Sequence, residues 1–126
     1  RTNMKILISI FILLILFACS KKVSQSSISV EQLRLLLRDN PNTALIDVRT
    51  AGEFNGPLYH IDGAQSIPLS DLSSYIVDLK SEDEKKYYMI CKSGTRSAKA
   101  TQIMKNSDLN AINVSGGMMA WSRLKK

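Results

Sequence analysis

The stretch Cys91-Lys92-Ser93-Gly94-Thr95-Arg96-Ser97 is the part of this chain that decides its fold and its chemistry. A short apolar run, Tyr87 to Ile90, precedes it, and a helix-like segment follows. A cysteine between a strand and a helix N-terminus meets unpaired backbone N–H groups, which favour the thiolate over the thiol. Gly94 lets the backbone curl around the sulfur, and two basic residues add positive charge. The stretch therefore predicts an anion-binding loop with a nucleophile, Cys91, at its floor.

Short apolar runs alternate with helix-like segments along the rest of the chain. We expect strands over residues 44–48, 64–67, 87–91 and 111–114. Ser29 and Gln32 form a capping-box pattern at the start of a first helix, and Ser70 can cap a second. Two more helices are expected over residues 97–105 and 118–124. The alternation predicts an α/β fold with a mostly parallel central sheet of four to five short strands and helices on both faces.

Apolar residues at helical spacing mark the sides of these helices that should face the sheet. They are Val30, Leu33, Leu36 and Leu37 in the first helix, Leu72, Ile76 and Leu79 in the second, Ala98, Ile103 and Met104 in the third, and Trp121 in the last. In a parallel sheet of this kind, ligands bind at the carboxyl ends of the strands. Cys91 is predicted to lie at such an end.

Four segments of the chain resemble the rhodanese family of sulfurtransferases, in the family's order. They are Leu45-Ile46-Asp47-Val48-Arg49 with Glu53-Phe54, His60-Ile61-Asp62-Gly63-Ala64 through Ile67-Pro68, the Cys91 loop, and Val114-Ser115-Gly116-Gly117-Met118-Met119-Ala120-Trp121. The resemblance covers roughly residues 28 to 124 and implies a three-layer rhodanese-like domain over residues 28–126. The chain departs from the family at Tyr59, where a glycine is usual, and at Gly56-Pro57-Leu58, which lengthens the loop.

The resemblance implies a role for each candidate site residue. Cys91 is the expected catalytic nucleophile, and Asp47 and Arg49 are expected to support the site without taking part in the chemistry. The expected substrate-binding residues are Lys92, Ser93, Gly94, Thr95, Arg96 and Ser97.

Several of these residues have a second interpretation that the sequence leaves open. Arg96 either holds the anionic substrate or pairs with a surface carboxylate, and Lys92 either contacts substrate or points to solvent. Ser97 is either a hydroxyl donor or only a helix-start residue. Arg49 can pair with Glu53. His60, the only histidine, is expected to be structural.

The function that the resemblance implies is transfer of a sulfane sulfur from a thiosulfate-like donor to a thiophilic acceptor through a persulfide on Cys91. Cyanide or a small thiol is the expected acceptor. One alternative is a persulfide carrier or a protein-binding module. Another is a phosphatase or arsenate reductase, but those loops have five residues between cysteine and arginine, and this one has four.

Charge and composition exclude several other classes of function. The formal net charge is +6, and it falls to +4 without Arg1 and Lys5. This balance, with no basic stripe carrying interleaved aromatic residues, predicts no nucleic-acid partner. The chain has one histidine and two cysteines, and Cys19 lies in the predicted signal segment discussed below. His60 and Cys91 alone cannot make a tetrahedral metal site, so we expect no metal and no other cofactor.

The first 19 residues are predicted to be a secretory signal peptide. Lys5 precedes an apolar run from Ile6 to Ala18, which is shorter than the ~20 residues of a membrane-spanning helix. The run ends in Leu16-Phe17-Ala18-Cys19, which resembles a bacterial lipobox with Cys19 as the lipidated residue, although Phe17 is bulkier than usual. An ordinary signal peptide or a short anchor is the alternative.

Residues 20–27 are polar and predict a flexible tether. We therefore expect a lipid-anchored protein of the bacterial cell envelope, with its domain outside the cytoplasm, in the periplasm.

Overall fold

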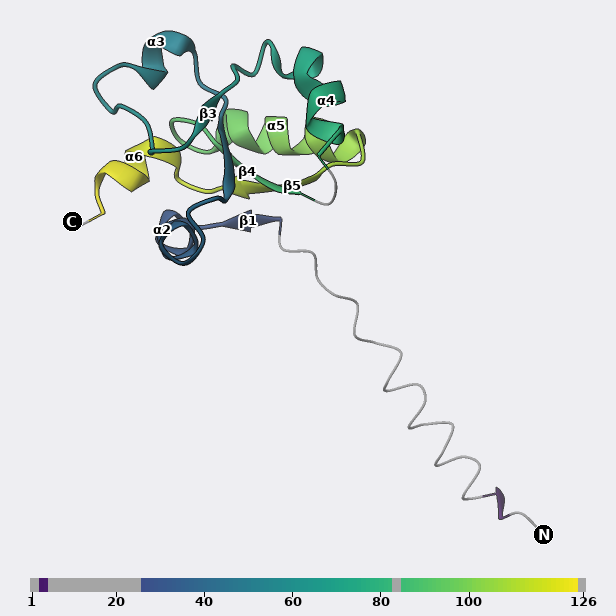
Figure 1. Ribbon diagram of the computed structural model, residues 1–126. Helices are drawn as coiled ribbons and strands as arrows, with labels where there is room; N and C mark the ends of the chain where they lie inside the picture. The colour runs from purple at the N-terminus through teal and green to yellow at the C-terminus, as the bar shows by residue number, and fades with distance from the viewer. Residues whose placement is uncertain (1–2, 5–25, 83–84, 125–126) are drawn as a thin grey trace.

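The computed structural model describes residues 3–4, 26–82 and 85–124 (Figure 1). Most of the predicted signal peptide, Cys19 and most of the predicted tether lie outside these residues. Along the chain the elements are β1 (Ser27–Ile28), α2 (Val30–Asp39), β2 (Ala44–Asp47), α3 (Ala51–Phe54), β3 (Gln65–Ser66), α4 (Leu72–Lys80), β4 (Lys86–Ile90), α5 (Thr95–Asn106), β5 (Asn110–Val114) and α6 (Gly117–Ser122).

The five strands form one sheet in the order β1-β5-β4-β2-β3, and every neighbouring pair is parallel. The predicted α/β fold with a parallel sheet is therefore confirmed. Figure 1 shows the sheet between α5 on one side and α2 on the other. Parallel strands buried on both faces need two apolar cores, and the sequence supplies both.

Each face of the sheet has its own hydrophobic core. The core under α4 and α5 contains Ile46, Val48, Ile67, Leu72, Leu79, Tyr87, Met89, Cys91, Ala100, Met104 and Ala111. The core under α2 and α6 contains Ile28, Val30, Leu33, Leu45, Ile61, Ile90, Ile112, Val114 and Met118, with Trp121 packed against it. Adjacent strand residues Met89 and Ile90 thus face opposite cores, as the pleat of a strand requires. The expectation that Trp121 packs the last helix onto the sheet is confirmed.

The first helix begins as the sequence predicts. The Ser29 side chain accepts a hydrogen bond from the Gln32 backbone N–H at 3.2 Å, and the Gln32 side chain accepts one from the Ser29 N–H at 2.9 Å. The prediction for Ser70 was wrong, because the residue before α4 is Asp71 and its side chain makes no capping hydrogen bond. The Ser70 hydroxyl instead donates to the Asp71 carboxylate at 3.3 Å.

Helix α5 begins two residues earlier than predicted, at Thr95. Its buried residues are Ser97, Ala100, Thr101 and Met104, which share one helical face. Ala98 lies off this face and is exposed, so the prediction that it packs on the sheet was wrong. In this helix Ser97 is the third residue, and its side chain is buried.

Two short elements were not predicted. Strand β1 includes Ser27, the last residue of the predicted tether, and the Ser26 carbonyl accepts a hydrogen bond from the Asn113 N–H at 3.2 Å. The one-turn helix α3 follows β2, and the Thr50 hydroxyl caps it by accepting from the Glu53 N–H at 3.2 Å. Helix α3 lies at the end of the sheet where β2 and β4 terminate, and it contributes to the site described below.

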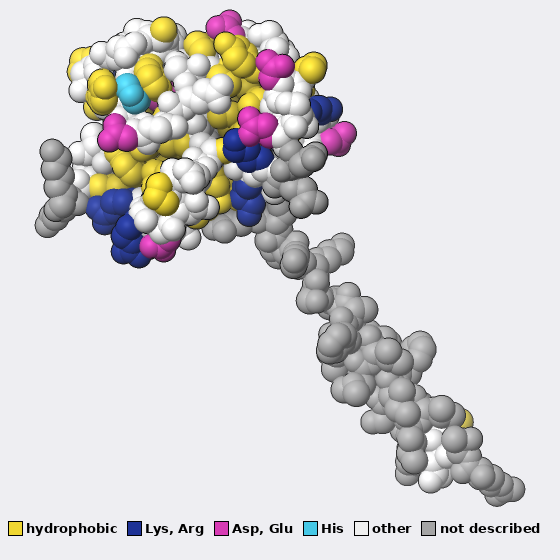
Figure 2. Space-filling model, in the orientation of Figure 1, with side chains coloured by type: hydrophobic (Ala, Val, Ile, Leu, Met, Phe, Trp, Pro, Cys, Tyr) yellow, Lys and Arg dark blue, Asp and Glu magenta, His cyan; other side chains and the backbone are white. Residues whose placement is uncertain are grey.

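Hydrophobic side chains gather over α3 and α4 on the face shown in Figure 2. Lys and Arg side chains on this face lie in separate groups with acidic side chains beside them, rather than in one continuous stripe. Within the described ranges, no helix has the length and apolar character needed to cross a bilayer.

Candidate active site

Two carbonyl groups of the Cys91 loop accept hydrogen bonds from the start of α6. The Met118 N–H donates to the Cys91 carbonyl at 2.8 Å, and the Met119 N–H donates to the Lys92 carbonyl at 3.0 Å. Gly117 permits this close approach, because it has φ +58° and a Cβ there would lie 2.5 Å from the Cys91 and Lys92 carbonyl oxygens. With its carbonyls held by α6, the loop can present its N–H groups to the sulfur.

Cys91 lies at the end of β4 and is only 1% exposed. Its sulfur accepts hydrogen bonds from the Gly94 backbone N–H at 3.1 Å and from the Ser97 hydroxyl at 3.3 Å. Gly94 has φ +105°, in the left-handed region where glycine is favoured, and this conformation aims its N–H at the sulfur. The hydroxyl of Ser97, a completely buried residue, is therefore a donor to the nucleophile, which answers the question that the sequence left open.

The surroundings of Cys91 lower the pKa of its thiol. Burial is the largest single influence and raises this pKa. The hydrogen bonds to the sulfur lower it, and together they have the greater effect. They come from the Ser97 hydroxyl and from the backbone N–H groups of Ser97, Gly94 and Ser93. A thiolate is the nucleophilic form of cysteine, so this arrangement favours the reactive form of Cys91.

Arg96 is held by a carboxylate from another part of the chain. Its two terminal nitrogens donate to the two Glu53 carboxylate oxygens at 2.7 and 2.8 Å. This bidentate hydrogen bond is the main reason that the pKa of Arg96 is raised, and the nearby Cys91 thiolate acts in the same direction. Of the two interpretations of Arg96, the structure thus shows pairing with a carboxylate, at a position where its charge still acts on the sulfur.

The same ion pair lowers the pKa of Glu53 to about 2, chiefly through the hydrogen bonds from Arg96 and against a smaller effect of burial. Because the folded pKa lies below the ordinary value of about 4.3, the pair stabilises the fold above that pH. This contribution is lost as the pH falls from there through about 2. Both side chains are about one-third exposed, so solvent weakens the interaction.

Asp47 and Arg49 form a second, fully buried ion pair beneath the site. The Arg49 guanidinium donates to the Asp47 carboxylate at 2.7 Å, and the Arg49 backbone N–H donates to it at 3.1 Å. Arg49 also donates to the carbonyl of Glu53 at 3.1 Å and to that of Tyr59 at 2.6 Å. The interpretation that Arg49 pairs with the Glu53 carboxylate was therefore wrong. That carboxylate binds Arg96, and Arg49 contacts only the backbone carbonyl of Glu53. Losing one partner of a buried pair costs about 3–5 kcal/mol, which suits a supporting role.

The His60 ring lies in a stack of aromatic rings within the connection formed by residues 53–60. It stacks on Phe54 with ring centroids 3.7 Å apart, and Tyr59 stacks on it at 4.0 Å. Its Nδ1 lies 2.9 Å from the Phe54 carbonyl oxygen, and since a carbonyl only accepts, Nδ1 carries the proton and donates. Tyr59 has φ +52°, so it adopts the left-handed conformation that a glycine would take more easily. These contacts give His60 a structural role.

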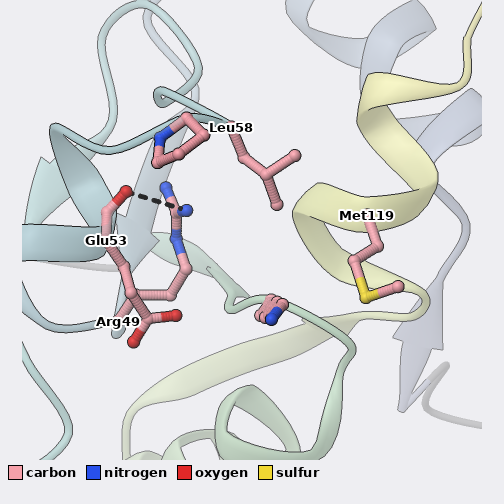
Figure 3. Close-up of a pocket in the computed structure, with 6 residues that line it drawn as sticks. Arg49, Glu53, Leu58 and Met119 are labelled. Carbon is pink, nitrogen blue, oxygen red and sulfur yellow. Dashed lines mark hydrogen bonds between the residues drawn. The ribbon is translucent and has the colours of Figure 1, made fainter.

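A cavity of about 370 Å³ lies beside the Cys91 loop. Its walls come from three parts of the chain: Arg49, Glu53, Pro57 and Leu58 from the connection after β2, Lys92 from the loop, and Met119 from α6. Figure 3 shows the Leu58 and Met119 side chains on opposite sides of this space. Sequence reasoning did not identify Glu53, Leu58 or Met119 as site residues, and the lengthened 56–58 loop was a signal for Leu58 alone.

The other predicted site residues lie on the rim of the loop. Lys92, Ser93 and Thr95 are exposed, and Lys92 forms part of the cavity wall. In the part of the chain that the structure describes, the Lys92 side chain makes no hydrogen bond or ion pair. The described residues also contain no group of three or more His, Cys, Asp or Glu side chains arranged to hold a metal ion.

Sequence comparison gives this site a family. The profile of a family described as "Rhodanese-like domain" matches residues 29–124. The chain belongs to the rhodanese-like domain family. The resemblance that the sequence showed in four motifs therefore holds over residues 29–124 as a whole.

Curated relatives of this rhodanese-like chain include proteins named for sulfur transfer. The probable adenylyltransferase/sulfurtransferase MoeZ of Mycobacterium tuberculosis is 36% identical over 99 residues, which are 78% of this chain and 25% of MoeZ. YrkF of Bacillus subtilis, whose name proposes a sulfur carrier, is 33% identical over 75% of this chain and 50% of its own. The chain thus spans a quarter to a half of these two relatives. The uncharacterized protein YqhL of Bacillus subtilis is 34% identical over 95% of this chain and 93% of its own.

Solved structures agree with the rhodanese-like fold. The crystal structure of SSP1007 from Staphylococcus saprophyticus superposes with a TM-score of 0.70 at 34% identity, covering 77% of this chain and 93% of that one. The human single-domain sulfurtransferase TSTD1 gives a TM-score of 0.67 at 27% identity, covering 80% and 98% of the two chains.

The hydrogen bonds around the sulfur predict how Cys91 reacts with an alkylating agent. In a chain carrying Cys19→Ser, so that Cys91 is its only thiol, the rate of iodoacetamide alkylation should rise with pH about a midpoint below 8.5, the approximate value for a free cysteine. Ser97→Ala removes one donor and should move the midpoint upward. Ser93→Ala keeps its backbone N–H and should leave the midpoint in place. A wild-type midpoint at or above the free value would contradict the proposed activation of the thiol.

Proposed function

We propose that this chain moves a sulfane sulfur from a thiosulfate-like donor to a thiophilic acceptor through a persulfide on Cys91. The observation that carries the proposal is the pair of hydrogen bonds to the Cys91 sulfur, from the Gly94 N–H at 3.1 Å and the Ser97 hydroxyl at 3.3 Å. These donors stabilise a negatively charged sulfur, and both the resting thiolate and the persulfide are such species.

The reaction proceeds in two half-reactions. The Cys91 thiolate attacks the outer sulfur of thiosulfate, the sulfur–sulfur bond of the donor breaks, and sulfite leaves with the bonding electron pair. In the second half-reaction an acceptor such as cyanide or a thiolate attacks the terminal sulfur of the persulfide and leaves with it, which restores the Cys91 thiolate. Covalent catalysis of this kind needs no metal or organic cofactor.

Persulfide carriage is the second candidate function, and the relationship to YrkF favours it. A carrier would load Cys91 in the same way but pass the sulfur to a protein rather than to a small molecule. Steady turnover with thiosulfate and cyanide supports the enzyme. Loading without turnover, followed by transfer to a co-expressed protein, supports the carrier.

Incubation with thiosulfate should add one sulfur, about 32 Da, to Cys91 in the full chain. Intact-mass analysis measures the addition, and peptide mapping places it on Cys91. Cyanide should remove the added mass, and Cys91→Ser should never acquire it. A mass that stays unchanged with thiosulfate and several other sulfane donors would rule out the sulfur-transfer proposal.

Arg96→Ala should slow persulfide formation by up to ~10²-fold, because it removes a cation near the sulfur and leaves the Glu53 carboxylate unpaired beside an anionic donor. The double variant Arg96→Ala/Glu53→Gln should recover part of this loss, since it also removes the repelling charge. Stopped-flow measurement of sulfite release provides the rates. Equal rates in wild type and Arg96→Ala would confine Arg96 to a structural role.

We also propose that residues 1–19 act as a lipoprotein signal and that Cys19 carries a lipid anchor in the bacterial cell envelope, with the domain on the periplasmic side. The support is the Leu16-Phe17-Ala18-Cys19 sequence after a short apolar run. When it is expressed in a bacterial host, the protein should appear in the membrane fraction, resist salt washing and incorporate a fatty-acid probe. Cys19→Ser should abolish the label and leave persulfide formation intact. If both chains incorporate the same negligible label, the segment is an ordinary signal peptide or anchor.

A further inference from the structure

The cavity beside the Cys91 loop is larger than the small inorganic substrates need. A water molecule takes about 30 Å³ of liquid, so the volume of about 370 Å³ holds roughly a dozen molecules of that size. Cyanide has two heavy atoms and would occupy a small part of it. The volume lies in the range of sites for small organic ligands and is far too small for a protein domain.

The cavity walls combine apolar surface with one free positive charge. Pro57, Leu58 and Met119 supply the apolar part, and Met119 is 37% exposed although it is a large hydrophobic side chain. The charges of Arg49 and Glu53 are already balanced, by Asp47 and Arg96 respectively.

Lys92 is the exception among the charged groups of the wall, because its ammonium has no ion-pair partner among the described residues. The wall therefore carries one unbalanced positive charge beside an apolar surface. This combination fits a ligand that has both an apolar part and a negative group.

The cavity lies beside the loop that carries the nucleophile, because its wall includes Lys92. Lys92 is the residue after Cys91, and consecutive Cα atoms are only about 3.8 Å apart. The Met119 backbone that holds the Lys92 carbonyl also fixes the opposite wall relative to the loop. In Figure 3 the Arg49 and Glu53 side chains lie on the Leu58 side of the space, across from Met119.

We propose that this cavity is an acceptor subsite for a low-molecular-weight thiol that carries an apolar chain and a carboxylate. The chain lies between Leu58 and Met119, and the carboxylate pairs with Lys92. The inference rests on the proposed sulfur-transfer function. In the step that it serves, the acceptor thiolate attacks the terminal sulfur of the Cys91 persulfide, a bond forms between these two sulfurs, and the bond to Cys91 breaks. The acceptor becomes a persulfide and Cys91 returns as a thiolate, so no outside oxidant or reductant is needed.

The test uses the full chain with Cys19→Ser, loaded with thiosulfate and freed of excess donor. Loading is first verified by mass, and the second-order rate of sulfur loss is then measured with four thiols. Mercaptoacetate and mercaptohexanoate carry a carboxylate on a short and a long chain, and mercaptoethanol and mercaptohexanol are their uncharged counterparts. Rates of a variant are compared with those of the loaded wild-type sequence for the same thiol, so differences in thiol pKa cancel.

Two variants and two matched controls separate the apolar and charged contributions. Met119→Ser should lower the ratio of long-chain to short-chain rates about fivefold, because part of the apolar contact is lost. Lys92→Gln should lower the ratio of carboxylate to alcohol rates about threefold, as expected for one exposed ion pair. Val77→Ser on α4 and Lys99→Gln on α5 change residues of the same type on other exposed surfaces and should change neither ratio.

The outcomes distinguish this inference from the proposed function itself. A chain that loads and shows both expected changes supports the subsite. A chain that loads but whose ratios are the same in the variants and controls, or that gives up its sulfur to none of the four thiols, overturns the subsite and leaves persulfide formation standing. A chain that never loads overturns both proposals.

Discussion

Two hydrogen bonds between the start of α6 and the Cys91 loop determine how the rest of the site is arranged. The Met118 and Met119 N–H groups bind the carbonyls of Cys91 and Lys92, which leaves the inner side of the loop to N–H donors. The approach is possible only because residue 117 has no side chain. The final helix, almost thirty residues beyond the cysteine, thus sets the electrostatic environment of the sulfur. This explains why a Gly-Gly pair near the end of the chain belongs to the site as much as the loop itself.

Much of the fold could be predicted from the sequence, because its signals are local. The capping box at Ser29, the apolar strand runs and the Gly-rich loop each report on a few neighbouring residues. Strand β1 was missed because it begins in the polar segment predicted to be a tether, and helix α3 because a single turn carries no helical period. Ala98 was assigned to the wrong face because, at 3.6 residues per turn, it lies about 100° around the helix from the buried Ser97.

The candidate site was predictable only as far as its loop. The nucleophile and the donors around it follow from the strand–loop–helix pattern. The partner of Arg96 does not, because Glu53 is 43 residues away in the sequence and two carboxylates, those of Asp47 and Glu53, compete for two arginines. The choice depends on burial: the Asp47–Arg49 pair is fully enclosed, and Glu53 is left to bind Arg96 near the surface. Geometry of this kind cannot be inferred from spacing alone.

The two outer strands of the sheet, β1 and β3, are only two residues long. A sheet edge exposes unpaired backbone groups, and a long edge strand can pair with the edge of another molecule. Here each edge offers too few such groups to align a second chain, and Pro68 follows soon after β3 and lacks an N–H donor. The brevity of the outer strands therefore protects the domain against edge-to-edge aggregation. Such protection matters most where chains crowd together at high local concentration, as they would on a shared surface.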